Sequence, residues 1–269
     1  MRKQMGLTRV DVVVALACVA LVLAQAAVLN AGGRERSKKE VCMANLRMLT
    51  AAWKAYADDN SGKLVNGGQP WSNISKPTEP YWYTPLPPVP VTDEVGTFPT
   101  TRFDWDLTLP YAERVSLLKR GALYGYVQNL DIYRCPEADK ITHRSYIIST
   151  AMNGAWTAMG GECFPVSRVA KNTAQIVKPD EKIVFLDEKI ITPDAFMFPA
   201  LVTCQLVDKL NVTHENGSNF AFADGHAEYH QWECPSTITW ALGGNPPVVS
   251  DTCFRTKDRA WLQNAIWGD

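Results

Sequence analysis

The sequence predicts an α+β fold, because helical periodicity in the first part of the chain gives way to strand patterns in the rest. Apolar residues at steps of three and four predict a helix that ends near Asp59. Two alternating runs around Asp224-Gly225 predict an antiparallel hairpin, since Asp-Gly suits a type I′ turn with positive φ at both central residues. Short apolar and aromatic runs at 145–149 and 182–186 predict two more strands, and residues 113–127 predict a short helix.

The first helix is expected in two parts, and its second part is amphipathic. An uncharged run is followed by a charged, amphipathic stretch at 34–60, and Asn60-Ser61-Gly62 supplies the turn chemistry that ends it. We expect the apolar stripe of this stretch to pack on the globular domain. The stripe consists of Val41, Leu46, Leu49, Trp53 and Tyr56.

The composition is that of a globular protein and argues against a nucleic-acid binder. The 269 residues carry 27 basic and 28 acidic side chains, whereas nucleic-acid binding usually needs a basic excess. With 46% hydrophobic residues, the chain is too apolar for a disordered one. We therefore expect a folded protein with no nucleic-acid partner.

Residues 12–29 form an uncharged run long enough to cross a bilayer. As a helix, its eighteen residues would span about 27 Å, close to the thickness of the hydrocarbon core. Three interpretations are open: a signal peptide cleaved after Ala26 or Ala31, a plain membrane anchor, and a prepilin-type leader with a retained anchor. Asp11 favours the third, because a carboxylate at the edge of the hydrocarbon needs a partner.

The cysteines favour an oxidising compartment. Cys18 lies in the uncharged run, and the other six are widely spaced without a Cys-x-x-Cys pair, which argues against a zinc ribbon or an iron–sulfur cluster. Six such cysteines fit an extracytoplasmic domain with disulfides, and the alternative is buried, reduced thiols in the cytoplasm. The six are Cys42, Cys135, Cys163, Cys204, Cys234 and Cys253.

Residues 66–110 are rich in proline, glycine and aromatic side chains. Proline excludes a central strand there, so we expect a long surface loop with polyproline character. Its Tyr81-Trp82-Tyr83 has two interpretations, a partner- or sugar-binding surface or aromatic rings folded back onto the core.

Several motifs, taken in order, resemble those of the H-X9-DG pseudopilin-like proteins, which carry a prepilin-type N-terminal cleavage and methylation site. The leader ends at Gly6, so that Leu7 would start the mature chain and Asp11 would be its fifth residue. The C-terminal signature runs from His214 to Asp224-Gly225-His226. The motifs between them are Cys42-Met43-Ala44-Asn45-Leu46, Tyr56 to Gly62, Arg134-Cys135-Pro136, Ser145-Tyr146 and the strand-ending acid Glu188.

This resemblance implies a type IV pilin-like fold, with a long N-terminal helix packed on an antiparallel β-sheet. The helix would be transmembrane first and amphipathic afterwards, and the Pro-rich loop would be an insertion. The resemblance also implies a Cys42–Cys135 disulfide. The expected organisation is a leader at 1–6, a transmembrane and assembly helix at 7–33, its amphipathic continuation at 34–60 and an extracytoplasmic domain at 61–269.

The function that the resemblance implies is structural and not enzymatic. We expect a single-pass protein of a bacterial inner membrane, with its C-terminal domain in the periplasm or, after assembly, in an extracellular filament. Its partners would be its own copies, other pseudopilins, the prepilin peptidase that processes the leader, and the membrane around the N-terminal helix. The assembly would be a type IV pilus-like filament or a type II secretion-like apparatus, and it requires no cofactor.

A second function class starts from the histidines near the C-terminal signature. His226, Glu228 and His230 alternate, so on a strand they project from one face and, with His214 or Asp224, could hold a divalent metal. The other interpretation is a solvated polar face with an aspartate chosen for its turn. The alternative function is therefore a membrane-anchored extracellular binding module or metal-dependent enzyme.

Overall fold

The structure, a computed structural model, describes most of the chain beyond residue 35. The described residues are 33, 36–67, 80–82, 88–93, 96–101, 110–139, 142–154, 162–188 and 195–268. The predicted processing residues Gly6, Leu7 and Asp11 lie outside this part, as does nearly all of the transmembrane segment predicted at 7–33. Within the described ranges, no helix is long and apolar enough to span a membrane.

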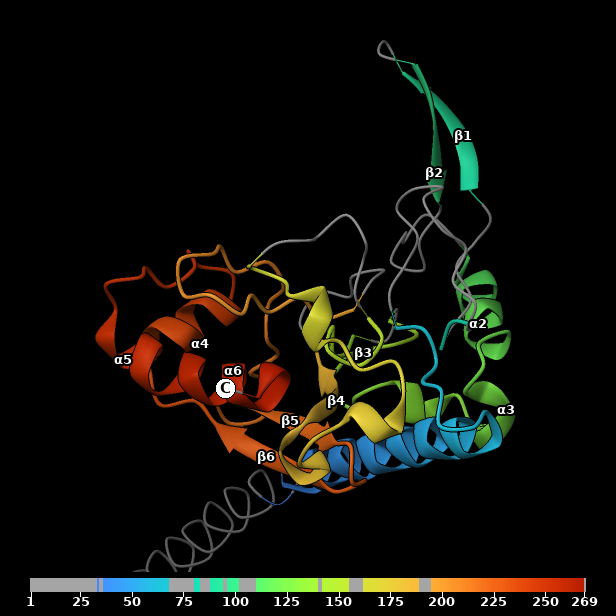
Figure 1. The fold of residues 1–269 in the computed structure, drawn as a ribbon, viewed down its shortest axis with the longest axis horizontal. Coiled ribbons are helices and arrows are strands. Elements are labelled where there is room, and N and C mark those ends of the chain that lie inside the picture. The colour runs from blue at the N-terminus through green and yellow to red at the C-terminus, as the bar shows by residue number, and fades with distance from the viewer. Residues whose placement is uncertain are drawn as a thin grey trace, which may run out of the picture.

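A four-stranded antiparallel sheet forms the centre of the fold (Figure 1). Its order follows the chain: β3 (Tyr146–Ile148), β4 (Ile183–Asp187), β5 (Gly217–Phe222) and β6 (Ala227–Gln231). Helices cover both faces, so the described part is an α+β fold, as predicted. Each predicted strand is present, with its ends shifted by one residue.

The helix of residues 36–59, called helix 36–59 below, packs on one face of the sheet and is drawn in blue along it in Figure 1. It shares one apolar core with side chains that alternate along the strands, including Tyr146, Ile148 and Ala221. Four residues of the predicted stripe are buried in this core, whereas Val41 is 46% exposed. The four are Leu46, Leu49, Trp53 and Tyr56.

The opposite face of the sheet packs against the C-terminal helices. These are α4 (Pro235–Ala241), α5 (Thr252–Thr256) and α6 (Asp258–Trp267). The intervening strand residues, such as Ile147 and Phe220, point into this second core. Because both faces are covered, every residue of β4 and β5 is buried. The charge-poor sequence of these two strands reflects that double burial.

Short helical elements complete the described part. The helix predicted at 113–127 is two helices, because the chain turns at Gly121, which donates its N–H to Leu118 O at 3.0 Å. The elements are α2 (Tyr111–Lys119), α3 (Tyr124–Val127), η1 (Asp131–Tyr133), η3 (Val166–Arg168), η4 (Thr173–Gln175) and η5 (Pro179–Glu181).

The Pro-rich segment contains a hairpin that the sequence did not predict. Strands β1 (Pro88–Asp93) and β2 (Gly96–Thr101) pair with each other and are separate from the four-stranded sheet. Proline is tolerated there because neither strand is central. Trp82, at the start of the segment, is fully buried against Tyr133 and Phe185, as expected for an aromatic ring folded back onto the core.

Two turns fix the ends of the main elements. Helix 36–59 ends at the predicted turn, where Gly62 has φ +80° and donates to Ala57 O at 2.8 Å. The predicted hairpin joins β5 to β6, but it is not a type I′ turn. Gly225, with φ +108°, has positive φ and Asp224 does not, and the Gly225 N–H donates to Phe222 O at 2.9 Å.

Two disulfides join segments near the C-terminal helices. Cys163 pairs with Cys204, and Cys234 pairs with Cys253. Cys42 and Cys135 are free thiols, so the disulfide implied for them by the resemblance is not formed in the structure. Both thiols instead face a carboxylate and an imidazole.

Candidate metal centre

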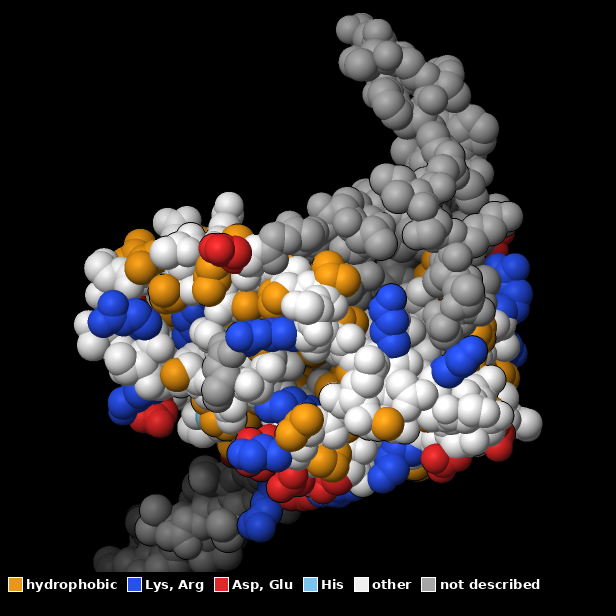
Figure 2. Space-filling model, viewed as in Figure 1, with side chains coloured by type: hydrophobic (Ala, Val, Ile, Leu, Met, Phe, Trp, Pro, Cys, Tyr) orange, Lys and Arg blue, Asp and Glu red, His pale blue; other side chains and the backbone are white. Residues whose placement is uncertain are grey.

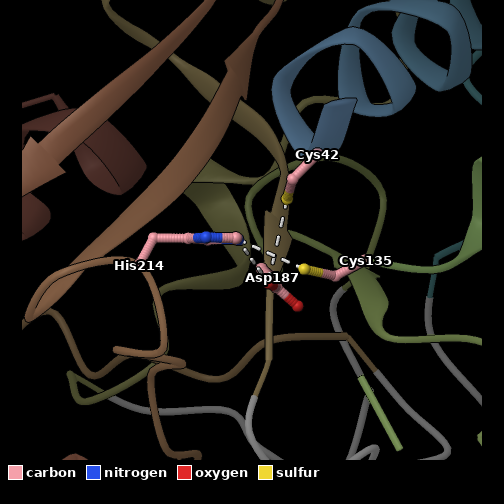
Figure 3. Close-up of side chains that lie close together, drawn as sticks. All are labelled: Cys42, Cys135, Asp187 and His214. Carbon is pink, nitrogen blue, oxygen red and sulfur yellow. Dashed lines mark hydrogen bonds and ion pairs between the residues drawn. The ribbon is translucent and has the colours of Figure 1, made fainter. Parts of the chain in front are cut away.

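Four buried side chains from four separate segments meet where helix 36–59 joins the sheet (Figure 3). Cys42 lies in the second turn of the helix, Cys135 follows η1, Asp187 ends β4, and His214 precedes β5. One ligand atom from each residue lies within 4.8 Å of the other three. The four side chains therefore form one compact group of sulfur, nitrogen and oxygen donors.

The contacts within the group are short. Cys135 Sγ lies 3.2 Å from His214 Nε2, and Asp187 Oδ2 lies 3.9 Å from both His214 Nε2 and Cys42 Sγ. Figure 3 shows all four side chains pointing toward one another. The side chains of His214 and Asp187 are each only 1% exposed, and both cysteines are fully buried.

The helix positions Cys135 through Asn45. The amide Nδ2 of Asn45 donates to Asp131 O at 3.3 Å and to Arg134 O at 3.0 Å, which holds the η1 loop against the helix. The Cys135 N–H then donates to Ser145 Oγ at 2.7 Å. The residues that the sequence grouped as Cys-x-x-Asn-Leu thus have separate tasks: Cys42 enters the group, Asn45 holds the loop of Cys135, and Leu46 is buried in the core.

Asp187 and His214 are held from the sheet side. Asn211 Nδ2 donates to Asp187 Oδ2 at 2.9 Å, whereas the other carboxylate oxygen, Oδ1, is buried and has no hydrogen-bond partner among the described residues. After His214 the chain reverses through Glu215 and Asn216, with φ values of +54° and +61°, and Gly217 N donates to His214 O at 2.9 Å. This turn aims the imidazole at the helix before β5 begins.

Burial and proximity perturb the acid–base behaviour of the group. Burial raises the pKa of Cys42, but hydrogen bonds from Cys135, His214 and Tyr146 outweigh it and bring that pKa down to about 5. The pKa of Cys135 is raised because its thiol hydrogen-bonds to Cys42 and is buried. Burial, and then the negative charge of Cys42, raise the pKa of Asp187 well above its ordinary value. The negative charge of one of these buried groups therefore disfavours ionisation of the others.

The geometry does not suit a nucleophilic triad. In such a triad one imidazole nitrogen contacts the nucleophile and the other contacts the acid. Here Nε2 of His214 faces both Cys135 and Asp187, while Nδ1 is buried and has no hydrogen-bond partner in the part of the chain that the structure describes. Two cavities in the described part, of about 560 and 310 Å³, are lined by none of the four residues. The group is buried and its geometry suits holding an ion.

The metal set predicted around the C-terminal hairpin is not assembled within the described residues. His226 stacks on Phe222 and its Nδ1 lies 2.7 Å from Asp224 Oδ1, at the hairpin turn. His230 stacks on Trp261 instead, with ring centroids 3.7 Å apart. Glu228, between them, is exposed.

The signature that the sequence grouped as His-x9-Asp-Gly also separates in space. Its two ends lie at opposite ends of β5, so the strand holds His214 about 20 Å from the Asp224 turn. The Asp224 end makes the turn, and the His214 end reaches the cysteines. Of the rival metal set, only His214 therefore takes part in a candidate metal group.

The sequence drew attention to Cys42 and Cys135 as an implied disulfide and to His214 separately, and it missed Asp187. The strand-ending acid was assigned to Glu188, but β4 ends at Asp187, and it is this carboxylate that faces the cysteines. Glu188 is one residue further along and forms a bridge with Leu210. Alternation along a strand places neighbouring residues on opposite faces, so an error of one residue selects the wrong carboxylate.

Comparison with models of known protein families, with curated proteins and with solved structures finds no match to this chain.

Proposed function

We propose that this chain is a pseudopilin-like structural subunit, anchored through its N-terminal segment and assembling through that segment into a filament or a secretion-like apparatus. The fold would then be type IV pilin-like, with helix 36–59 as the second half of a longer N-terminal helix. The observation that carries the proposal is the convergence of the motifs. Residues from four of the motifs that resemble the H-X9-DG proteins meet at the junction of helix and sheet, although they span positions 42 to 214.

The hairpin of the C-terminal signature supports the same proposal, because it and the turn before it contact helix 36–59 near both ends of the helix. Near one end, Lys39 Nζ lies 3.0 Å from Glu215 Oε2 and 4.1 Å from the centre of the Tyr229 ring. Near the other end, Lys54 Nζ donates to Asp224 O at 2.5 Å. Lys39 and Lys54 are about 22 Å apart along a helix, so the signature hairpin accompanies four turns of it.

A helix held in this way suits a subunit whose N-terminal segment carries the assembly contacts. In the proteins that the leader resembles, an acid at the fifth mature position pairs with the amino terminus of a neighbouring subunit. In this chain Asp11 and an amino group at Leu7 would make that pair. The ion pair would fix the axial position of one subunit against the next, and the rigid connection from helix to sheet would carry the domain with it.

Surface charge is consistent with a structural subunit. On the face shown in Figure 2, basic and acidic side chains lie among uncharged ones, and the described surface there has no continuous basic patch. The buried, closed position of the one candidate metal group in the described residues supports a structural function over the metal-dependent enzyme.

The processing of the leader tests this proposal directly. The full-length chain is expressed with a prepilin peptidase, and the mature N-terminus is sequenced. A start at Leu7 is the expected result. A retained Met1, or a start after Ala26 or Ala31, would rule the prepilin assignment out in favour of a plain anchor or a cleaved signal peptide.

Assembly is tested by a matched pair of variants. Asp11→Ala removes the proposed pairing acid, whereas Asp58→Ala removes an exposed acid on helix 36–59. Filaments or higher assemblies detached from the membrane should be lost with Asp11→Ala and retained with Asp58→Ala. Equal assembly by the two variants would contradict the proposal.

A further inference from the structure

We propose that Cys42, Cys135, Asp187 and His214 bind one zinc ion, which ties helix 36–59 to the sheet. This site goes beyond the proposed function and does not depend on it, because the four residues meet within the described domain whatever the N-terminal segment does. The donors are two thiolates, one imidazole and one carboxylate, a set that suits zinc.

The spacing of the donors fits tetrahedral coordination. With ordinary zinc–ligand bond lengths, pairs of sulfur, nitrogen and oxygen ligands lie about 3.4–3.8 Å from each other. The three pairs measured here lie at 3.2, 3.9 and 3.9 Å, and no pair exceeds 4.8 Å. Binding an ion therefore requires the ligand atoms to move closer by at most about 1 Å in any pair.

A divalent cation also suits the charge that these side chains carry as metal ligands, once they have released their protons. Two thiolates and one carboxylate then carry three negative charges, which a protein interior tolerates only when they are paired. A divalent ion would cancel most of this charge and occupy the space that the four side chains face. It would also give the buried donors a partner, including Asp187, whose Oδ1 accepts no hydrogen bond within the described residues.

A disulfide between Cys42 and Cys135 explains the same side chains less well. A disulfide is uncharged and needs no polar neighbours, so Asp187 and His214 would remain side by side in the core. Their closest atoms are 3.9 Å apart, too far for a hydrogen bond. The other four described cysteines form disulfides, and none of them belongs to the candidate metal group. The described cysteines are thus of two kinds, disulfide-bonded ones and free thiols beside an acid and an imidazole.

The neighbours of the four donors are those of a structural zinc site. The Glu137 N–H donates to Cys135 Sγ at 3.4 Å, Tyr146 Oη donates to Cys42 Sγ at 3.3 Å, and Asn211 donates to Asp187. All four positions are filled by protein, and the site is buried, so no coordination place remains for a substrate. The ion would join four segments that packing and hydrogen bonds already bring together.

Metal analysis of the full-length chain, produced with added zinc and purified in detergent, tests the site. About one zinc per chain is expected in the wild type, with Cys42 and Cys135 recovered as free thiols on peptide mapping. His214→Gln and Cys135→Ser should lose the zinc, whereas His226→Gln, which changes an exposed histidine at the hairpin turn, should retain it. Zinc retained by His214→Gln, or a wild type without zinc and with Cys42 linked to Cys135, would overturn the proposal.

Cobalt gives a readout that does not depend on the folding of any variant. The wild-type chain is stripped with a chelator and titrated with Co²⁺ under reducing conditions. We expect the visible bands of tetrahedral cobalt, a sulfur-to-cobalt charge-transfer band, and displacement of both by Zn²⁺. Cobalt that binds without the charge-transfer band would show that the thiolates are not ligands and would refute the site.

Discussion

Cys135 Sγ and His214 Nε2 lie 3.2 Å apart although 79 residues separate them in the chain. No local spacing links the two: Cys135 follows η1, which Asn45 ties to helix 36–59, and His214 precedes β5, the neighbour of β4 in the sheet. Together with Cys42 and Asp187, this pair forms the candidate metal group at the junction of helix 36–59 and the sheet. Substitutions at this junction should therefore change the free energy of unfolding.

Zinc should stabilise the folded domain, because the ligands come together only in the folded state. Free zinc at 100 times its dissociation constant should add about 2.7 kcal/mol to the free energy of unfolding. The measurement is urea unfolding of the full-length chain, followed by tryptophan fluorescence across a series of buffered zinc concentrations. Asp187→Asn should respond much less, and an equal response would show that the zinc acts elsewhere.

Asn45 should matter for stability although it binds no ion. Its side chain donates to Asp131 O and Arg134 O, so Asn45→Ala leaves two carbonyl groups without these donors. An expected loss of about 1–3 kcal/mol in the free energy of unfolding follows. Asn245→Ala is the matched control, because Asn245 is exposed, and its effect should be within about 0.5 kcal/mol. Equal effects of the two substitutions would mean that the amide does not hold the Cys135 loop.

Much of the fold follows from patterns of short range, which is why the sequence predicts it. The stripe of helix 36–59 repeats at helical spacing, and the alternation around Asp224 marks a hairpin, so both elements are where the sequence places them. The exact turn differs, because Asp-Gly serves several turn types and the strands select among them. The sequence did not predict the hairpin of β1 and β2, because the prolines indicated a loop. Proline excludes only a central strand, so it is compatible with a two-stranded hairpin.

The candidate site was harder to predict because its residues share no local pattern. Cys42, Cys135, Asp187 and His214 are separated by tens of residues, unlike the paired spacing of zinc ribbons. The sequence therefore offered a disulfide for the two cysteines and a separate metal set for the histidines. The structure separates these histidines, because His214 lies before β5, His226 lies at the hairpin turn and His230 lies on β6.

The C-terminal helices should depend on Asp258. Its buried carboxylate accepts from Glu233 N and Cys234 N at 3.1 Å each, and from Thr237 Oγ1 at 2.5 Å, which ties α6 to the start of α4. Asp258→Ala should cost on the order of 3 kcal/mol, since hydrogen bonds to a charged group are lost and buried donors remain. Asp251→Ala, which removes the cap of the shorter α5, should cost about 1 kcal/mol.

Hydrogen exchange distinguishes a local effect of Asp258 from a global one. Asp258→Ala should speed the exchange of amides in α4 and α6 more than those in helix 36–59, which packs on the other face of the sheet. Uniform acceleration over both faces would contradict a local role of this carboxylate.

The hairpin turn at Asp224 should weaken in acid. Burial raises the pKa of this carboxyl, but hydrogen bonds from the backbone and side chain of His226 outweigh that effect and hold it below its ordinary value of 3.8. Because the folded pKa is the lower one, the stabilisation is present above about pH 3.8 and is lost as the pH falls through the folded value.

Asp224→Asn keeps an oxygen acceptor without the charge, so its stability should change less over this range than that of the wild type. The comparison is made by chemical denaturation from pH 6 to pH 2, with Asp180→Asn as an exposed control. Identical pH profiles for the wild type and Asp224→Asn would mean that the contact between Asp224 and His226 does not stabilise the turn.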